Sequence, residues 1–324
     1  MKYPWIRILK VTLSNQVGST ITLGGIGSKS LDITVDAIKK FSPLQDEAKV
    51  TITNLGYTQM LQIIRGQYFN IKIECGYTNR GTQTIFNGGI LYMSNELVDK
   101  QMNKVIILCA SKLIARFGQV RMSLTLNSSI NLYTAMNFVL KHAGIDTYTL
   151  SPDLKSQKLG DYFNLKTSTP QNYLTYFQEG YDNIIKGISS DNSNGSSVNI
   201  LSTSKRRKMV INNDVIDISN GYPQMTNSGL SLTVVPIANF MPGDIIVVDN
   251  SMIDISASTM SDFKQNIPSR LQQDGSYVLS EVRYVLQNRG QNFYCSLQCA
   301  LTEISATTKS DPSKIKHRYT GIQE

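Results

Sequence analysis

The sequence predicts a mainly-β (α+β) fold in which two antiparallel β-barrel domains flank a small helical α/β insert. Apolar and polar residues alternate with a period of two through most of residues 1–125, which is typical of half-buried strands. The spacing changes to that of helices in residues 126–187 and returns to that of strands in residues 188–305. Residues 306–324 form a polar, basic tail. We therefore expect two superposable barrels, each with a sheet of its own.

The first block is expected to consist of strands that bury one face. Apolar side chains alternate with polar ones in Leu31–Ala37 and in Phe69–Cys75, and a further strand covers Val105–Cys109. A short helix interrupts them at Tyr57–Arg65, where Gly66 ends the helical spacing. This pattern predicts antiparallel strands around one hydrophobic core.

The insert is expected to hold two helices. The first covers Ser128–Ala143 and stops at Gly144. The second begins at Thr169, a good N-cap, with Pro170 at its first helical position, and we expect it to end at Gly187. The aromatic residues of the second helix fit either packing against a sheet or a ligand pocket, and packing requires fewer assumptions.

The second block is expected to open with a flexible loop at Ser189–Ser197. Pro242–Asp244 predicts a turn into a strand at Ile245–Val248, and Val278–Leu301 predicts a hairpin that turns at Asn-Arg-Gly. Met252–Ser276 is polar, and a loop of this length is usually functional or disordered. We expect it to be mobile in a single subunit and ordered in an assembly.

The composition describes an ordinary folded protein with a positive charge. The chain has 324 residues, of which 41% are hydrophobic and 17% charged, and this length suits two or three domains. No apolar run could cross a bilayer, and Pro4 and Arg7 interrupt a signal-peptide core, so we expect a cytoplasmic product without membrane insertion. The net charge of +8 invites a nucleic-acid role. The one dense basic cluster, Lys205–Lys208, lacks interleaved aromatic residues, which favours a solvated hairpin tip over a nucleic-acid contact.

The residues that usually carry chemistry are few and scattered. Cys295 and Cys299 have the spacing of half a metal site, but on a strand they lie on one apolar face, which favours a core position. His142 lies on a predicted helix without a nearby carboxylate, and His317 lies in the tail. Gly24–Gly27 precedes a strand and not a helix, which favours a hairpin loop over a phosphate-binding loop. We predict no catalytic residue, no cofactor and no metal, and a chain that is not an enzyme.

Several motifs follow one another in an order that is known from one family. Ala48–Leu55 is a strand that ends in Asn-Leu, Phe69–Tyr77 ends in Cys-Gly-Tyr, and Ile85–Ile90 carries Phe-Asn-Gly-Gly. In the second half, the turn at Pro242–Asp244 and the hairpin Tyr277–Leu301 follow. Over about residues 3–305 this order resembles the baseplate hub proteins of contractile-tailed bacteriophages, which are related to the spike-bearing proteins of type VI secretion systems.

The resemblance implies a structural virion protein of the phage tail baseplate that is assembled in the host cytoplasm. Such a hub subunit carries two tube-type β-barrels and a smaller α/β part, and three subunits form a ring. The homotrimer would join the sixfold inner tail tube protein to a separate tail spike protein. Tape measure and baseplate wedge proteins are further expected partners, and DNA is expected only in transit through the central channel.

Two other functions remain open from the sequence. An inner tail tube or tail-completion protein would also be structural, although tube subunits generally hold one such barrel. A carbohydrate-binding or cell-wall-degrading protein on a β scaffold is the second alternative, and surface aromatic residues in a groove together with an isolated carboxylate pair would favour it.

Overall fold

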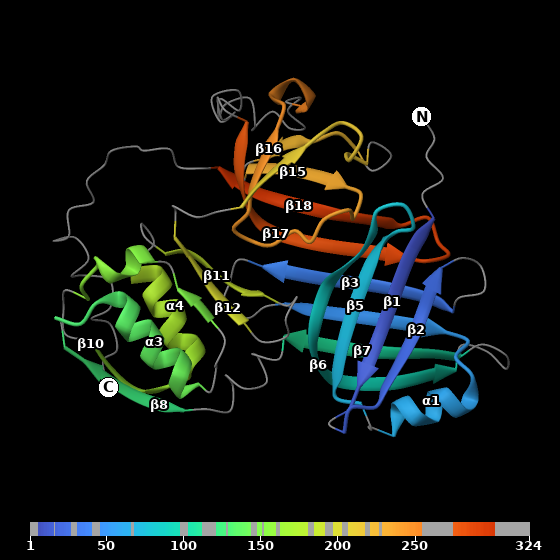
Figure 1. Cartoon of the computed structure of the whole chain (residues 1–324), viewed down its shortest axis with the longest axis horizontal. Helices are drawn as coiled ribbons and strands as arrows, with labels where there is room; N and C mark the ends of the chain where they lie inside the picture. Colours follow the sequence, from blue (N-terminus) through green and yellow to red (C-terminus); the bar gives the residue numbers. More distant parts are fainter. Residues whose placement is uncertain are drawn as a thin grey trace.

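The computed structural model confirms a mainly-β fold with a small helical insert (Figure 1). The structure describes residues 6–15, 17–26, 31–40, 46–65, 68–97, 103–111, 121–127, 129–143, 148–150, 152–159, 163–180, 185–191, 197–202, 207–217, 221–226, 229–254 and 275–301. The basic tail, Gly66, Gly144, Lys205, Arg206 and most of the Met252–Ser276 loop lie outside these residues, so the predictions made for them stay predictions.

The first block is a two-layered arrangement of strands with one short helix. Its elements are β1 (Arg7–Ser14), β2 (Thr20–Ile26), β3 (Asp32–Lys40), β4 (Glu47–Thr53), α1 (Tyr57–Ile64), β5 (Asn70–Tyr77), β6 (Gly81–Leu97) and β7 (Asn103–Ser111). The strands pair in the order β3-β4-β7-β6-β5-β1-β2. In Figure 1, β1 and β5 cross β3 and β7 at a steep angle. Apolar side chains of both layers fill the space between them, as the period-two pattern predicts.

One long strand, β6, belongs to both layers. Its first half pairs with β5 and its second half pairs with β7. Gly88 and Gly89 lie at the corner, and a β-bulge at Leu91 follows. A Cβ on Gly88 would lie 2.3 Å from the carbonyl oxygen of Ala110. The corner therefore requires glycine at position 88.

Of two predicted first-block features, the glycine-rich loop is wrong and the short helix is confirmed. Gly24 and Gly25 belong to β2 and do not form a hairpin loop, although both have positive φ angles. Both glycines pair with β1 in an uninterrupted register, opposite Lys10 and Leu9. The predicted helix after the fourth strand is confirmed as α1, whose Met60 and Ile63 are buried in the core.

The insert has its own small core. It contains β8 (Met122–Leu126), α3 (Leu132–His142), β9 (Tyr148–Leu150), the 3-10 helix η1 (Pro152–Lys155), β10 (Phe163–Ser168) and α4 (Pro170–Gly180). β11 (Ile185–Asp191) and β12 (Ser197–Ser202) form a sheet with β9. Asn131 caps α3 by accepting a hydrogen bond from the Thr134 amide at 2.8 Å. The first helix therefore starts later than the predicted Ser128.

The end of the second helix was predicted wrongly. Thr169 does act at its start, because its hydroxyl oxygen accepts a hydrogen bond from the Asn172 amide. The helix is observed to Gly180, and Gly187 lies in β11. Ser189–Asp191, predicted as loop, also belong to β11. A glycine within a strand was mistaken for a helix stop, since both signals use the same residue.

The second block contains β13 (Lys208–Ile211), β14 (Gln224–Thr226), β15 (Gly229–Val234), β16 (Ile245–Val248), the 3-10 helix η3 (Asn250–Met252), β17 (Ser276–Gln287) and β18 (Phe293–Leu301). The predicted turn before β16 and the predicted β17–β18 hairpin are confirmed. β12 and β13 do not pair with each other, because β12 pairs with β11 and β9 while β13 pairs with β16. Lys205–Lys208 is therefore not the tip of a hairpin between these two strands.

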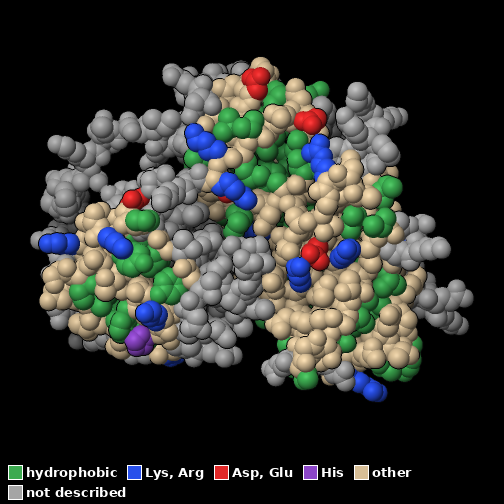
Figure 2. Space-filling view, in the orientation of Figure 1, with side chains coloured by type: hydrophobic (Ala, Val, Ile, Leu, Met, Phe, Trp, Pro, Cys, Tyr) green, Lys and Arg blue, Asp and Glu red, His purple; other side chains and the backbone are tan. Residues whose placement is uncertain are grey.

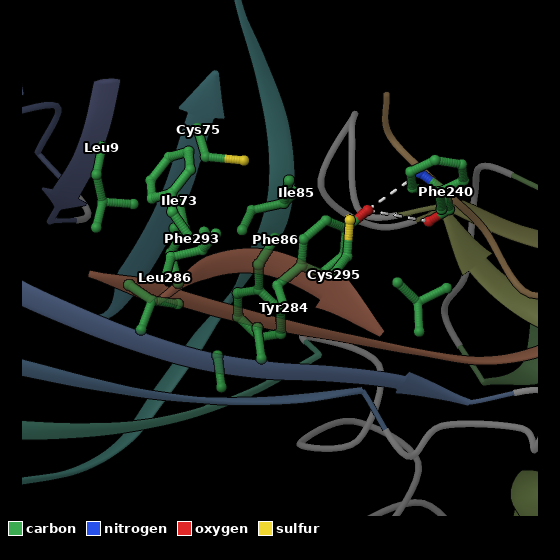
Figure 3. Close-up of a cluster of buried hydrophobic side chains, with 14 of the residues drawn as sticks. Leu9, Ile73, Cys75, Ile85, Phe86, Phe240, Tyr284, Leu286, Phe293 and Cys295 are labelled. Atoms are coloured by element: carbon green, nitrogen blue, oxygen red, sulfur yellow. Dashed lines mark hydrogen bonds between the residues drawn. The ribbon is translucent and has the colours of Figure 1, made fainter. Parts of the chain in front are cut away.

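The two blocks share one sheet, which departs from the expectation of two separate sheets. β17 pairs along one edge with β18 and along the other with β3, so the order continues from β14-β15-β18-β17 into β3-β4-β7-β6. One cluster of buried apolar side chains also spans both blocks. Figure 3 shows Cys75 and Phe86 of the first block beside Tyr284 and Cys295 of the second. β3 pairs with β4 along one edge, and its other edge would be open in the first block alone. The backbone groups of that edge pair with β17, and this pairing makes the sheet continuous.

Candidate functional site

We call the pairing of β3 with β17 the junction. On the outer face, the Arg283 guanidinium forms two hydrogen bonds to the Asp36 carboxylate, at 2.9 and 2.6 Å. Lys40 lies 3.7 Å from Glu281 across the same two strands. Because these side chains are half exposed, each ion pair contributes little to stability, and its main effect is on which residues of the two strands lie opposite each other.

The inner side of the junction holds a buried lysine. Lys39 is 2% exposed, and its Nζ donates a hydrogen bond of 2.8 Å to Asn239 Oδ1 of the second block. The Nζ also lies 5.7 Å from the centre of the Tyr284 ring. The Tyr284 hydroxyl accepts a hydrogen bond from the Phe240 amide at 3.0 Å (Figure 3). Burial raises the pKa of Tyr284, so this hydroxyl stays neutral.

The turn of the β17–β18 hairpin is fastened to the first block. Arg7 donates to the carbonyl oxygens of Gly290 at 2.6 Å and Gln291 at 3.1 Å. The Asn288 side chain accepts from the Ile33 amide at 2.8 Å and donates to the carbonyl oxygen of Leu31. The hairpin that sequence patterns predicted is thus also the element that joins the two blocks.

Arg207, part of the basic cluster, has a structural contact. Its guanidinium binds the Asp244 carboxylate with Nε–Oδ1 and Nη2–Oδ2 distances of 3.0 and 2.5 Å. Asp244 is 6% exposed and also accepts from the Met241 amide. This bidentate pair ties the predicted Pro-Gly-Asp turn to β13, so this arginine is engaged within the chain.

The outer face of the continuous sheet is a surface to which both blocks contribute strands. Between β3, β4, β6 and β7 it is hollowed by about 620 Å³, where Leu91 and Leu108 lie beside Lys49 and Glu47. Its basic side chains are matched by acidic ones, and the charged residues are Asp32, Asp36, Lys40, Glu47, Lys49, Glu96, Lys104, Glu281 and Arg283. A face with balanced charges does not bind polyanions through its net field.

On the opposite face, where β1 and β5 lie, the residues that the structure describes form no concentrated basic patch. Figure 2 shows its lysine and arginine side chains scattered singly among the described residues, with acidic side chains near several of them. The described helices are all too short or too polar to span a membrane.

The residues considered for chemistry have structural surroundings. All four cysteines are buried thiols, and burial raises the pKa of Cys75 and Cys109 to about 12. Cys295 and Cys299 lie on the inner face of β18, which confirms the core position. His142 is on α3, with its ring stacked 4.0 Å from that of Phe138. Among the described residues, no three His, Cys, Asp or Glu side chains are grouped closely enough to hold a metal.

Comparisons with known proteins show the fold. No family model matches the sequence, and no curated protein matches it. A tail protein from Neisseria meningitidis MC58 has a TM-score of 0.56 at 11% identity, covering 92% of this chain and 97% of that chain. The 43 kDa tail protein of prophage MuSo2 from Shewanella oneidensis has a TM-score of 0.55 at 9% identity, covering 91% and 96%. The chain thus shares its fold with these two tail proteins over nearly their full lengths.

Proposed function

We propose that this chain is a structural subunit of a phage tail baseplate, where three copies form a hub ring between the sixfold inner tail tube and the threefold spike. The observation that carries the proposal is the fold shared with two tail proteins over more than nine-tenths of each chain. Fold alone does not define function, and so the junction supplies the second support. It places two β blocks side by side in one subunit.

The number of blocks explains why three copies suit the role. Two blocks in each of three subunits give six around the ring, which matches a sixfold tube on one side and leaves threefold symmetry for the spike. Head-to-tail contacts between unlike surfaces close such a ring when the rotation is correct. Tape measure and wedge proteins would contact its periphery, and DNA would pass through its centre.

Imaging of the assembled tail tests this proposal. We expect three copies in one ring, between the tube and the spike. Six copies of the chain in each ring would instead support an inner tube protein, and two copies would reject the hub. The mass of the purified protein gives an earlier measurement, with a trimer expected at high concentration.

We further propose that the chain has no hydrolytic activity. Its cysteine thiols are buried and protonated. Of the two histidines, His142 is the one that the structure describes, and it lies on the surface of α3. A zymogram on peptidoglycan should show no clearing at the position of the pure protein. A cleared band would favour the cell-wall-degrading alternative.

A further inference from the structure

The sheet ladder has the same irregularity in both blocks. In the first block, Ile90 lies opposite Cys109 and Tyr92 lies opposite Leu108, so Leu91 is an extra residue in β6. A β-bulge of this kind bends the strand at a defined position. The bulge therefore gives a reference position from which the strands of the two blocks can be compared residue by residue.

The second block repeats this bulge. Leu279 lies opposite Cys299 and Glu281 lies opposite Gln298, so Ser280 is the extra residue in β17. Both long strands also change pairing partner here: the pairing of β6 with β5 ends at Gly89, and the pairing of β17 with β16 ends at Val278, each two residues before the bulge. β17 is therefore the counterpart of β6, with Ser280 in the place of Leu91.

The neighbouring strands continue the correspondence. Next to Cys109 lies Ala48 of β4, and next to Ala48 lies Ala37 of β3. Next to Cys299 lies Leu230 of β15, and the residue next to Leu230 is Met225 of β14. The order β6-β7-β4-β3 in the first block thus equals β17-β18-β15-β14 in the second, and Met225 takes the place of Ala37.

One edge of this repeated unit is used in one block and open in the other. The outer edge of β17 pairs with β3. The equivalent edge of β6, at Tyr92–Leu97, pairs with no strand among the described residues. Tyr92 and Leu97 on this segment are 58% and 78% exposed. Natural proteins cover, blunt or pair such edges, because open edges recruit other strands.

We propose that the β6 edge at Tyr92–Leu97 pairs with β14 of a second copy of this chain, repeating between subunits the junction that β17 and β3 make within one. The proposal rests on the proposed ring, whose head-to-tail contact it locates. An open edge at one end of the repeated unit and β14 at the other are unlike surfaces, as a ring contact requires.

The junction also fixes the register of this contact. Tyr284 lies opposite Ala37 within the chain. Counted from the bulge, Asn95 corresponds to Tyr284, and Met225 corresponds to Ala37. Asn95 of one copy should therefore lie opposite Met225 of the next. In antiparallel pairing this places Ser94 opposite Thr226 and Glu96 opposite Gln224.

The β14 edge has a partner in the single chain that must leave. The Met225 amide donates to the Asp254 carbonyl oxygen at 3.2 Å, and the Asp254 amide donates to the Pro223 carbonyl oxygen at 2.6 Å. An incoming strand offers the same kinds of groups, so hydrogen bonds are exchanged and not lost. The Met225 amide points to this edge, so Ser94 and Thr226 would form a non-hydrogen-bonded pair, whose side chains are the closest in a ladder.

Cysteine cross-linking tests both the contact and its register. Ser94→Cys combined with Thr226→Cys should form a disulfide between copies after mild oxidation of the full chain with oxidised glutathione. We expect covalent dimers and trimers on a non-reducing gel that disappear with reductant. The native cysteines are buried and should give no background. Opposite residues have Cβ atoms about 4.5–5.5 Å apart, close enough for a disulfide.

The matched control combines Ser94→Cys with Gln224→Cys. Gln224 lies on the same face of β14 two residues away, so its Cβ should lie about 7–8 Å from that of residue 94, beyond disulfide reach. Cross-linking of this pair as efficiently as the first would overturn the register. A trimer by mass measurement without cross-linking of the first pair would overturn the edge contact and leave the ring intact. A chain that neither associates nor cross-links would overturn the edge contact, while tail imaging still decides the ring.

Discussion

Replacing Gly88 with alanine should damage the corner at which β6 passes from one layer to the other. The new Cβ would lie 2.3 Å from the Ala110 carbonyl oxygen and 2.6 Å from Cε1 of the Phe86 ring. Ala110 is backbone in the adjacent strand β7, and Phe86 is fully buried, so neither neighbour can move freely. Gly89→Ala is the matched control, because its Cβ would meet only the Phe69 carbonyl oxygen at 3.9 Å.

The two variants should differ by a measurable free energy of unfolding. Both substitutions restrict the unfolded chain equally, which by itself stabilises by about 0.4–1 kcal/mol. Overpacking of a well-packed core costs about 1–3 kcal/mol. A contact at 2.3 Å with backbone is a definite overlap, and a small adjustment of the corner can relieve part of it, so we take the middle of that range. We therefore expect Gly88→Ala to be about 2 kcal/mol less stable than Gly89→Ala, a difference that includes only the contact.

Urea unfolding followed by far-ultraviolet circular dichroism measures this difference. With a slope of about 2 kcal/mol per M, the midpoint of Gly88→Ala should fall about 1 M below that of Gly89→Ala. Equal midpoints, or a lower one for Gly89→Ala, would refute the reasoning that the corner has no room for a side chain at position 88.

Three further outcomes follow from individual contacts. A thiol reagent at pH 8 should find no reactive cysteine in the native protein and four after unfolding, and a fast native reaction would contradict their burial. Burial raises the pKa of Cys75 from 9.0 to about 12 on folding, so the neutral thiol favours the folded state fully below pH 9. The free energy of unfolding should therefore fall as the pH rises above 9, by roughly 1 kcal/mol at pH 10, and should fall further toward pH 12. Unfolding midpoints that stay constant between pH 8 and pH 10.5 would count against this. Asp36→Asn, at the exposed Arg283 pair, should change the free energy of unfolding by less than about 1 kcal/mol. Asp244→Ala removes the buried carboxylate that binds Arg207 and should cost about 1.5–3 kcal/mol. Chemical denaturation that reverses this order would contradict the assignment of the buried pair.

The local elements of this fold could be predicted from sequence, because each follows from a short-range pattern. The hairpin of β17 and β18 follows from alternation around Asn-Arg-Gly, and α1 follows from three apolar residues at helical spacing. Every second residue of β3 points inward, and Lys39 is one of these residues, so the alternation also predicts that Lys39 is buried. A charged residue at an inward position normally argues against a strand, and its partner Asn239 is 200 positions away.

The junction could not be predicted from sequence, because strand pairing between distant segments leaves no local signal. β3 and β17 each pair on two sides, yet their alternation is the same as that of strands with one partner. Gly187 shows the opposite failure, in which a strong local signal was assigned to the wrong element. The candidate site therefore depends on long-range register, which only the structure supplies.

The junction within one chain and the proposed contact between copies would differ in strength, and this difference suits a subunit that folds before it assembles. Within the chain, the junction carries the Arg283–Asp36 pair and the Arg7 contacts to the hairpin turn. At the equivalent contact between copies, Ser94 takes the place of Arg283, and Gln224 takes the place of Asp36. Hydroxyl and amide groups replace an ion pair there, and the incoming strand must first displace Asp254. The junction would form when the chain folds, whereas the contact between copies would form only where the tube or the spike holds neighbouring copies at high local concentration.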